Sequence, residues 1–327
     1  MGWGFLAYFV IVTISSLLGH SDEPFSLISD LGDIFVFWGI CILYLPDKCE
    51  FIIRALIVSL CCCIYFNFIL MLKYPTGLWW DNSSDMGYYL LGGNYNQMGR
   101  TLLPAIGIHG YYTIRYNKWR TSLYALMATC IATLLIVKSM TSLVCVLILV
   151  IFFFIPNEKT RRWAFISFLI FYLLFQGFVV FLQQDLQSYK LVTYFVEEVL
   201  HKDLTFTHRT TVWADGFALI RESPLIGYGY NSTAWYAERL QVATAHNIII
   251  DEFIKGGILL FMVDIFLVFN AISAYLKNRC RETQFLAFSC LTFMFMMIME
   301  VYMFAYVAMM LLLLAYSNYL VPQTEEQ

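Results

Sequence analysis

One apolar run decides the fold class of this chain. Residues 285–319 read FLAFSCLTFMFMMIMEVYMFAYVAMMLLLLAYSNY, and Glu300 is the one charged residue among them. A helix crosses the apolar layer of a bilayer with about 20 residues, so this run is too long for a single crossing. We therefore divide it into two spans, 285–299 and 301–319, and expect a tight hairpin at Glu300.

The composition of the whole chain agrees with this reading. The 327 residues are 60% hydrophobic and 13% charged, whereas a soluble domain is about 45–50% apolar and about 25% charged. We expect an all-α integral membrane protein that forms a single polytopic domain over residues 1–327. The other spans are predicted at 3–19, 26–45, 51–72, 98–114, 120–137, 139–155, 163–182 and 247–270, which gives about ten transmembrane helices.

Two of these spans need comment. The first has no Lys or Arg before its apolar residues, so we interpret it as a retained span and not as a cleaved signal peptide. The fourth, 98–114, is the weakest, because Gly99, Pro104, Gly107 and Gly110 interrupt it. Either a kinked crossing helix or a re-entrant segment agrees with this pattern.

Basic residues in short loops predict the orientation. With ten spans, four basic loops lie on one face together with both termini: Lys48; Arg115, Lys118 and Arg120; Lys159, Arg161 and Arg162; Lys277, Arg279 and Arg281. Because such loops stay in the cytoplasm, both termini are predicted to be cytoplasmic and the long loop 183–246 extracytoplasmic. The net charge of −3 and the absence of a basic tract argue against a nucleic-acid partner.

His246 is the first candidate for chemistry. It lies where the long loop enters the span 247–270, and an imidazole can accept or relay a proton near neutral pH. If it belongs to the helix, His246 shares one stripe with Ile250, Phe253 and Gly257. The alternative is a hydrogen-bonded histidine at the membrane interface without a catalytic role.

Arginines on the outer side are candidates for phosphate binding, because guanidinium groups bind phosphate through paired hydrogen bonds. They are Arg100, Arg209, Arg221 and Arg239. The alternative is that they pair with acidic neighbours on a solvated helix, and we favour this for Arg221 and Arg239. Arg209 has Trp213 one helical turn away, which suits a membrane interface. Arg100 enters the membrane and needs a partner or a polar cavity.

Several other residues complete the sequence picture. The segment Pro224–Tyr230 is a turn whose tyrosines suit sugar rings or a membrane interface equally well. Gly256 and Gly257 would allow another helix or a lipid chain to approach closely, and Asp251 and Lys255 have the spacing of a helix ion pair. The nine cysteines suggest no metal site, and the sequence contains no nucleotide-binding or metalloprotease motif. We therefore expect neither a metal nor a cofactor.

Together these residues resemble a known family. Arg209-x-x-x-Trp213, then Ser223-Pro224-Leu225-Ile226-Gly227-Tyr228-Gly229, then Ala245-His246-Asn247 leading into Gly257, are similar in order and spacing to the O-antigen polymerase/ligase superfamily. Its members are integral membrane glycosyltransferases of class C architecture. The resemblance covers about residues 205–260, with weaker echoes at Asn94-x-Asn96 and Lys138-Ser139-Met140-Thr141.

The resemblance implies a donor saccharide on undecaprenyl diphosphate in a bacterial cytoplasmic membrane. An acceptor hydroxyl attacks the anomeric carbon and the lipid diphosphate leaves, without a metal or a nucleotide sugar. It assigns catalysis to Arg209 and His246, and we expect substrate contacts from Arg100, Arg221, Trp213, Tyr228, Tyr230 and Asn247. Membrane lipid, a chain-length regulator and a flippase are the expected partners.

The chain also departs from the family pattern. Met140 stands where many members have an arginine, and Lys138 could supply that charge; Lys255 stands where a glutamate is common. The compact outer loop and the turn residues favour a polymerase of O-antigen, capsule or exopolysaccharide repeat units. The alternatives are a ligase that transfers the chain to lipid A core or another acceptor, and a flippase for lipid-linked sugars.

Overall fold

The computed structural model describes the chain except for residues 20, 26, 82–85, 92, 183–205 and 321–327. Its first half contains α1 (Gly2–Leu18), α2 (Leu27–Lys73), α3 (Gly99–Tyr116), α4 (Arg120–Ile136), α5 (Met140–Phe154) and α6 (Glu158–Leu174), which continues as a π-helix, Phe175–Phe181. The second half contains α8 (Phe206–Glu222), α9 (Thr233–Leu240), α10 (Ile248–Lys277), α11 (Arg281–Met296), α12 (Phe304–Ala315) and α13 (Ser317–Leu320).

The helices have the length and the surface of a membrane protein. Within α2, within α6 with its π-helical extension, and in α10, three stretches are long and apolar enough to cross a bilayer: Gly32–Lys73, Glu158–Phe181 and Ile248–Lys277. Helices α1, α4, α5 and α12 are shorter but also apolar. Large apolar side chains are exposed along α2, α6 and α10, among them Phe51, Trp163 and Phe269. Such a surface fits a lipid environment, which agrees with the predicted fold class.

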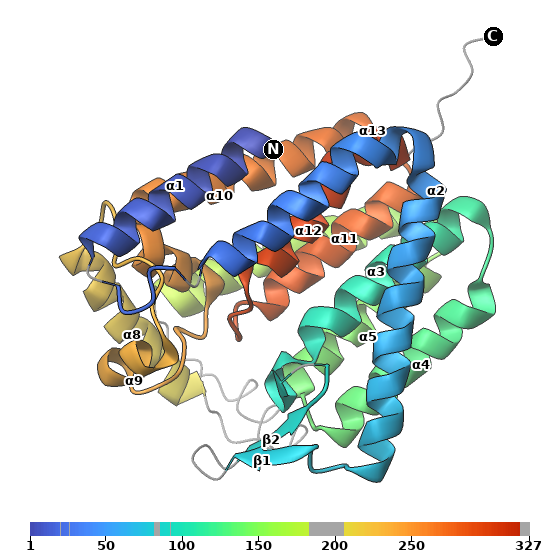
Figure 1. Cartoon of the computed structure of the whole chain (residues 1–327). Coiled ribbons are helices and arrows are strands. Elements are labelled where there is room, and N and C mark those ends of the chain that lie inside the picture. The colour runs from blue at the N-terminus through green and yellow to red at the C-terminus, as the bar shows by residue number, and fades with distance from the viewer. Residues whose placement is uncertain (20, 26, 82–85, 92, 183–205, 321–327) are drawn as a thin grey trace.

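The long helix α2 covers two of the predicted spans, 26–45 and 51–72. Its 47 residues would extend roughly 70 Å at 1.5 Å per residue, about twice the apolar thickness of a bilayer. It is bent at Lys48, whose φ of −127° and ψ of 30° are not helical, just after Pro46. The bend divides α2 into two arms that run in different directions (Figure 1).

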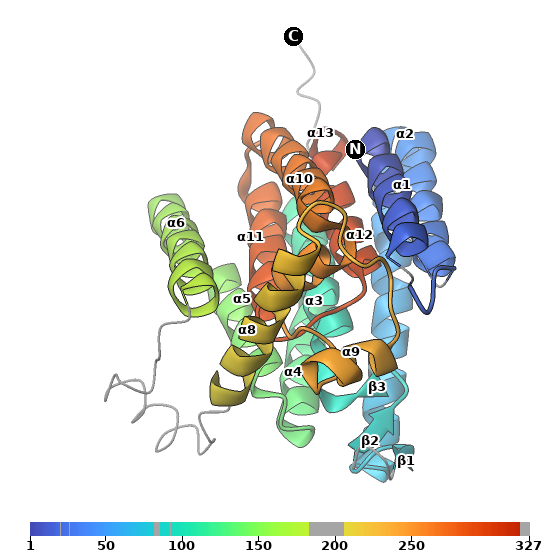
Figure 2. The same cartoon turned by 90° about the vertical axis from the view of Figure 1, so that its left-hand side faces the viewer.

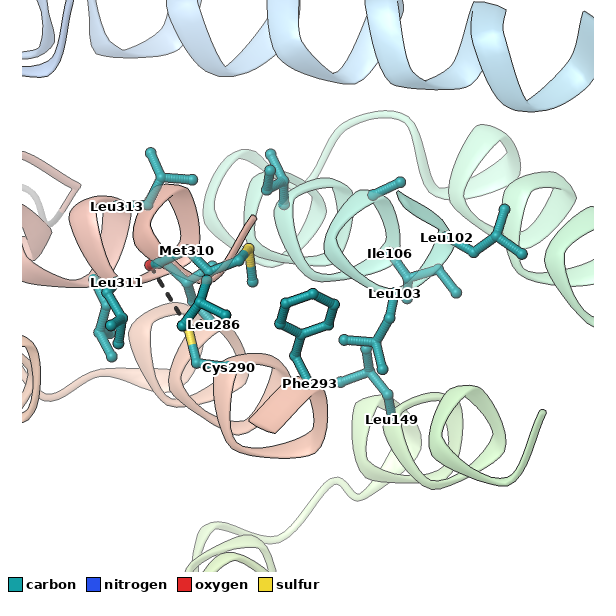
Figure 3. Packing of buried hydrophobic residues seen from close by; sticks show 14 of the residues in the cluster. Leu102, Leu103, Ile106, Leu149, Leu286, Cys290, Phe293, Met310, Leu311 and Leu313 are labelled. Carbon is teal, nitrogen blue, oxygen red and sulfur yellow. Dashed lines mark hydrogen bonds between the residues drawn. The ribbon is translucent and has the colours of Figure 1, made fainter. Parts of the chain in front are cut away.

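Helix α3 is the centre of the core, and it is one helix from Gly99 to Tyr116 although its sequence suggested a break. Its glycines lie where α11 approaches, because a Cβ atom on Gly110 would be 2.2 Å from the Phe285 ring and one on Gly107 would be 2.5 Å from Ser289 Oγ. Small residues allow such close helix packing in membranes. Leu102, Leu103 and Ile106 of α3 belong to the same buried cluster as Phe293 of α11 and Leu149 of α5 (Figure 3).

The basic loops gather at one end of the molecule. Lys118 pairs with Glu50 beside the bend of α2 at 3.4 Å, and Arg115 lies 3.9 Å from Glu282 at the start of α11. Arg161 donates to Gln284 of α11, at 3.4 Å. These contacts place the four basic loops together, as the sequence predicted from the span count. The N-terminus and α13 also lie at this end, whereas α9 lies at the other (Figure 2).

The loop between α2 and α3 adds a small β-structure that the sequence did not indicate. It contains a small antiparallel sheet in the order β1-β2-β3, formed by Trp79–Asp81, Met86–Tyr89 and Gly93–Asn94. Trp79 pairs with Tyr88, and their rings stack with centroids 6.0 Å apart. The sheet lies at the same end as α9 (Figure 2). In the predicted long loop 183–246, the described residues 206–246 form the two helices α8 and α9.

Candidate functional site

The connection between α11 and α12, Met297–Met303, organises the candidate site. Its backbone accepts from Ile248 N at Met297 O (3.0 Å) and from Asn247 Nδ2 at Ile298 O (3.4 Å). Arg209 donates to the carbonyl of Met299. The hairpin predicted at Glu300 is therefore confirmed as a break between two helices. It also holds α8 and the start of α10 together, which the sequence did not indicate.

Glu300 joins the two residues that the sequence assigns to catalysis. Its Oε1 lies 3.1 Å from Nη2 of Arg209, and its Oε2 lies 3.8 Å from Nδ1 of His246. All three side chains are partly buried, with 21%, 24% and 13% of the Arg209, His246 and Glu300 side chains exposed. Partial burial strengthens an ion pair relative to one in water. The counter-ion of Arg209 is therefore Glu300, in the connection between α11 and α12, and not one of the acidic residues of α8.

His246 itself lies outside α10, which corrects the predicted helical stripe. Its φ is 50°, in the left-handed region, and the helix begins two residues later at Ile248. The left-handed conformation ends the preceding loop, so His246 is not part of the helical row of Ile250, Phe253 and Gly257. Its backbone N–H donates to Thr244 Oγ1 at 3.4 Å, and its Nδ1 is buried without a hydrogen bond among the described residues.

Asn247 has a structural role beside the histidine. Its side-chain oxygen accepts from the backbone of Ile249 at 3.0 Å and Ile250 at 3.2 Å, so it caps the N-terminus of α10. Its amide also exchanges hydrogen bonds with Gln176, at 3.2 and 3.3 Å. Gln176 lies in the π-helical segment that follows α6, and such segments are often found at functional sites.

The turn Pro224–Tyr230 packs against a break in α10. Gly257 has a φ of 61° and interrupts the helix, which leaves carbonyl groups of the preceding turn without helical partners. Tyr228 N donates to Ile254 O at 2.7 Å and Gly229 N donates to Lys255 O at 2.8 Å, while Ile258 N donates to Pro224 O at 2.9 Å. A segment does approach closely at Gly256 and Gly257, but it is this turn and not the helix or lipid chain that the sequence predicted.

Other candidates from the sequence lie around the site at different distances. Arg100 donates to Gln97 at 2.8 Å and lies over the ring of Tyr306 in α12, 5.3 Å from its centroid. Nearby, Tyr302 of the α11–α12 connection donates to Asn96 O at 3.1 Å. Arg100 thus approaches the connection that holds Arg209. Lys138, in contrast, is exposed at the turn between α4 and α5.

Arg221 and Trp213 do not join the cluster of Arg209, His246 and Glu300. Arg221 is exposed near the far end of α8 from Arg209, about 18 Å away along the axis for a separation of twelve residues. Trp213 is fully buried in a second core cluster with Val212 and Trp235. Its ring is packed inside the protein and is not open to a ligand, because α8 turns this face toward α10.

The two tyrosines of the turn have different surroundings. Tyr228 donates to Glu222 at 2.9 Å, and its ring lies 5.4 Å from that of Trp235. Burial and the hydrogen bond to Glu222 raise the pKa of the Tyr228 phenol to about 12. Tyr230 lines a cavity beside Lys255, whose Nζ lies 5.8 Å from the centre of the tyrosine ring.

Sequence reasoning placed Glu300 at a hairpin between two spans but did not connect it to Arg209 or His246. The sequence did hold a reason to connect them. A carboxylate inside the membrane needs a charged partner, and an arginine on the outer side needs one too. Gln176 was missed entirely. It gives no comparable signal, because a single amide in the predicted span 163–182 is a common feature.

Comparison with known proteins gives one match, which is to a family model. No curated protein matches the chain. A family model described as O-Antigen ligase matches residues 107–264, which include α8, the turn Pro224–Tyr230, His246 and the start of α10. The residues that carried the strong resemblance, about 205–260, lie within this range, so residues 107–264 match the family that the sequence was found to resemble.

Proposed function

We propose that this protein polymerises undecaprenyl-diphosphate-linked oligosaccharide repeat units into O-antigen, capsular polysaccharide or exopolysaccharide at the outer face of a bacterial cytoplasmic membrane. The observation that carries the proposal is the arrangement of Arg209 and His246 on the two oxygens of Glu300. Arg209 and His246 lie in the part of the chain that matches the O-antigen ligase family model, residues 107–264, and Glu300 joins them from outside it.

Arg209 binds the diphosphate of the donor in this proposal. Guanidinium has five N–H donors, and the contacts with Met299 O and Glu300 use the terminal nitrogens. The partly exposed group can therefore add contacts to a phosphate oxygen without leaving Glu300. Arg100 supplies a second positive charge from α3, because it lies against Tyr306 close to the same connection.

His246 is the proton acceptor. Glu300 faces its Nδ1, and a carboxylate at that position favours the proton on Nδ1 and leaves Nε2 as the acceptor. The acceptor hydroxyl attacks the anomeric carbon of the donor and its proton passes to Nε2. The bond from the anomeric carbon to the diphosphate oxygen breaks, and undecaprenyl diphosphate leaves with the electron pair. The contact of 3.8 Å is long for a hydrogen bond, but such contacts often shorten when substrate binds.

The orientation follows the positive-inside rule. The end that gathers the four basic loops and the N-terminus is cytoplasmic, and α9 with the small sheet is extracytoplasmic. Ten spans correspond to α1, the two arms of α2, α3, α4, α5, α6 with its π-helical extension, α10, α11 and α12. A flippase and a chain-length regulator are partners that the polymerase reaction calls for.

A ligase is the second candidate, because the matched family is described as O-Antigen ligase. The test is an assay with the purified full chain and lipid-linked repeat units, without nucleotide sugar, metal or ATP. A ladder of longer lipid-linked chains supports the polymerase. Transfer only after lipid A core is added supports the ligase, and lipid movement across vesicles without any transfer supports a flippase.

A further inference from the structure

A small cavity lies beside the Arg209–Glu300–His246 cluster and has no assigned role. It encloses about 220 Å³ between α1, the start of α9, α10 and the α11–α12 connection. Thr244 and Val301, which line it, are two residues from His246 and one residue from Glu300. A molecule in this cavity would lie next to the reacting groups of the proposed transfer.

The floor of the cavity carries buried charge. Lys255 Nζ lies 2.6 Å from Asp251 Oδ2 and 3.1 Å from Glu252 Oε1, and Tyr8 donates to Glu252 Oε2 at 2.8 Å. The ion pair predicted between Asp251 and Lys255 is confirmed. Charges are costly in the membrane interior, and those that persist usually serve a ligand or a transport path.

The walls are aromatic with polar edges. Tyr8, Tyr230, Tyr236 and Tyr302 line the cavity, together with Asn231. Tyrosine offers a flat apolar face and a hydroxyl group, and Asn231 adds an amide. Flat faces with hydroxyl, amide and carboxylate groups match a sugar ring, which is apolar on its faces and carries hydroxyls around its edge.

The charged residues of the cavity lining favour a sugar over a phosphate as its ligand. Of these charged residues, Asp251 and Lys255 line the cavity, whereas Glu252 contacts Lys255 and Tyr8 without being a lining residue, so the lining pairs one carboxylate with one ammonium group. A diphosphate would have to compete with Asp251 for the ammonium group of Lys255, whereas the hydroxyls of a neutral sugar can donate to Asp251 while that pair stays intact. The volume is below the about 300–1,000 Å³ of sites for drug-sized ligands, so it suits a terminal sugar and not a long chain.

We infer that this cavity binds the terminal sugar of the acceptor chain and presents its hydroxyl to His246. The inference rests on the proposed function, because the acceptor is the second substrate of that reaction. It separates the two substrates in space: the donor diphosphate lies at Arg209, and the acceptor sugar lies between Tyr230 and the Asp251–Lys255 pair.

The test uses a substitution at the cavity wall with a matched neighbour. Thr233 is exposed at the start of α9 and lines the cavity, whereas the adjacent Ala234 is exposed but is not among the lining residues. Thr233→Trp places an indole in the cavity, and Ala234→Trp adds the same side chain beside it. Lys255→Met is a second variant that removes the ammonium group from the floor.

The probe is the free repeat-unit oligosaccharide, released by hydrolysis from the surface polysaccharide of the source strain. Its affinity for the purified full chain is measured by calorimetry. We expect saturable binding to the unaltered protein and to Ala234→Trp, and at least a tenfold weaker affinity for Thr233→Trp and Lys255→Met. Equal affinity for all four proteins, or no saturable binding to the unaltered protein at millimolar oligosaccharide, overturns the inference.

The proposed function is scored separately with the lipid-linked donor. If the unaltered protein binds the oligosaccharide in this cavity but forms no polymer or transfer product, the cavity inference stands and the polymerase proposal fails. If the protein polymerises the donor while Thr233→Trp keeps the same KM for acceptor, the polymerase proposal stands and the cavity inference fails.

Discussion

Arg209 and Glu300 are 91 residues apart in the chain, and their side chains form an ion pair with 3.1 Å between Nη2 and Oε1. The pair connects α8, in the predicted outer loop, to the break between α11 and α12 inside the bundle. It therefore fixes the outer segment to the membrane part of the protein close to the start of α10, two residues after His246.

The first prediction concerns the strength of this pair. Replacing one partner of a buried ion pair leaves the other charge uncompensated, so Glu300→Gln and Arg209→Met each lower the free energy of unfolding. Together they cost less than the sum, and we expect a coupling energy of about 0.5–3 kcal/mol. The measurement is a double-mutant cycle of unfolding free energy in mixed micelles. Additive losses would show that the two side chains do not interact.

The second prediction concerns His246 as proton acceptor. His246→Ala is expected to lower the polymerisation rate by about 10²- to 10⁴-fold, the usual contribution of a general base. The matched control is His109→Gln, since His109 is buried between Thr113 and Ser122 at 3.2 and 3.1 Å and lies away from the cluster. Equal rates for His246→Ala and the unaltered protein, at equal insertion, would remove the histidine from the mechanism.

The third prediction concerns the break in α10. A Cβ atom on Gly257 would be 2.3 Å from the carbonyl carbon of Leu225, and the φ of 61° is unfavourable for alanine. Gly257→Ala should therefore destabilise the protein by about 1–3 kcal/mol, the range for overpacked sites. Gly39→Ala in α2 is the control, because nothing lies within 4 Å of its added Cβ. Thermal unfolding of both variants in detergent tests this, and an equal Tm for the two would contradict the prediction.

The sequence predicted the helices well because each apolar run has a length set by the bilayer. It also predicted the gathering of the basic loops, which Lys118–Glu50 and Arg115–Glu282 contacts confirm. It predicted the span 98–114 but left open a kinked or re-entrant form, and in the structure α3 is one helix whose glycines serve close packing against α11. A glycine pattern alone does not distinguish a helix break from close packing, since the answer depends on which helix lies opposite.

The candidate site was predictable only in part. The order of Arg209, the turn at Pro224 and His246 identified the segment, but the partner of each residue depends on contacts between distant elements. Glu300 comes 54 positions after His246 in the chain, and no local spacing connects them. The helical stripe predicted for His246 was wrong because its left-handed backbone places it before the N-cap of α10.

The fourth prediction separates the two roles of Asn247. Asn247→Ser keeps an oxygen that can cap α10 but removes the amide that meets Gln176 and Ile298 O, whereas Asn247→Ala removes both. Loss of an N-cap costs about 1 kcal/mol, so Asn247→Ala should be less stable than Asn247→Ser by about that amount. Unfolding free energies give the comparison. Equal stability of the two variants would mean that capping contributes nothing here.

The fifth prediction tests the orientation with two added cysteines. Glu238 of α9 is 78% exposed at the end proposed to be extracytoplasmic, and Lys277 is exposed at the basic end. In intact cells, a membrane-impermeant maleimide should label Glu238→Cys, because the reagent reaches that end from outside. Lys277→Cys should be labelled above the parent protein, which keeps its nine cysteines, only after the cells are permeabilised. Labelling of Lys277→Cys in intact cells, with Glu238→Cys protected, would reverse the orientation. The cluster of Arg209, Glu300 and His246 would then lie nearer the side on which nucleotide sugars are available, and the lipid-linked donor would no longer be the required substrate.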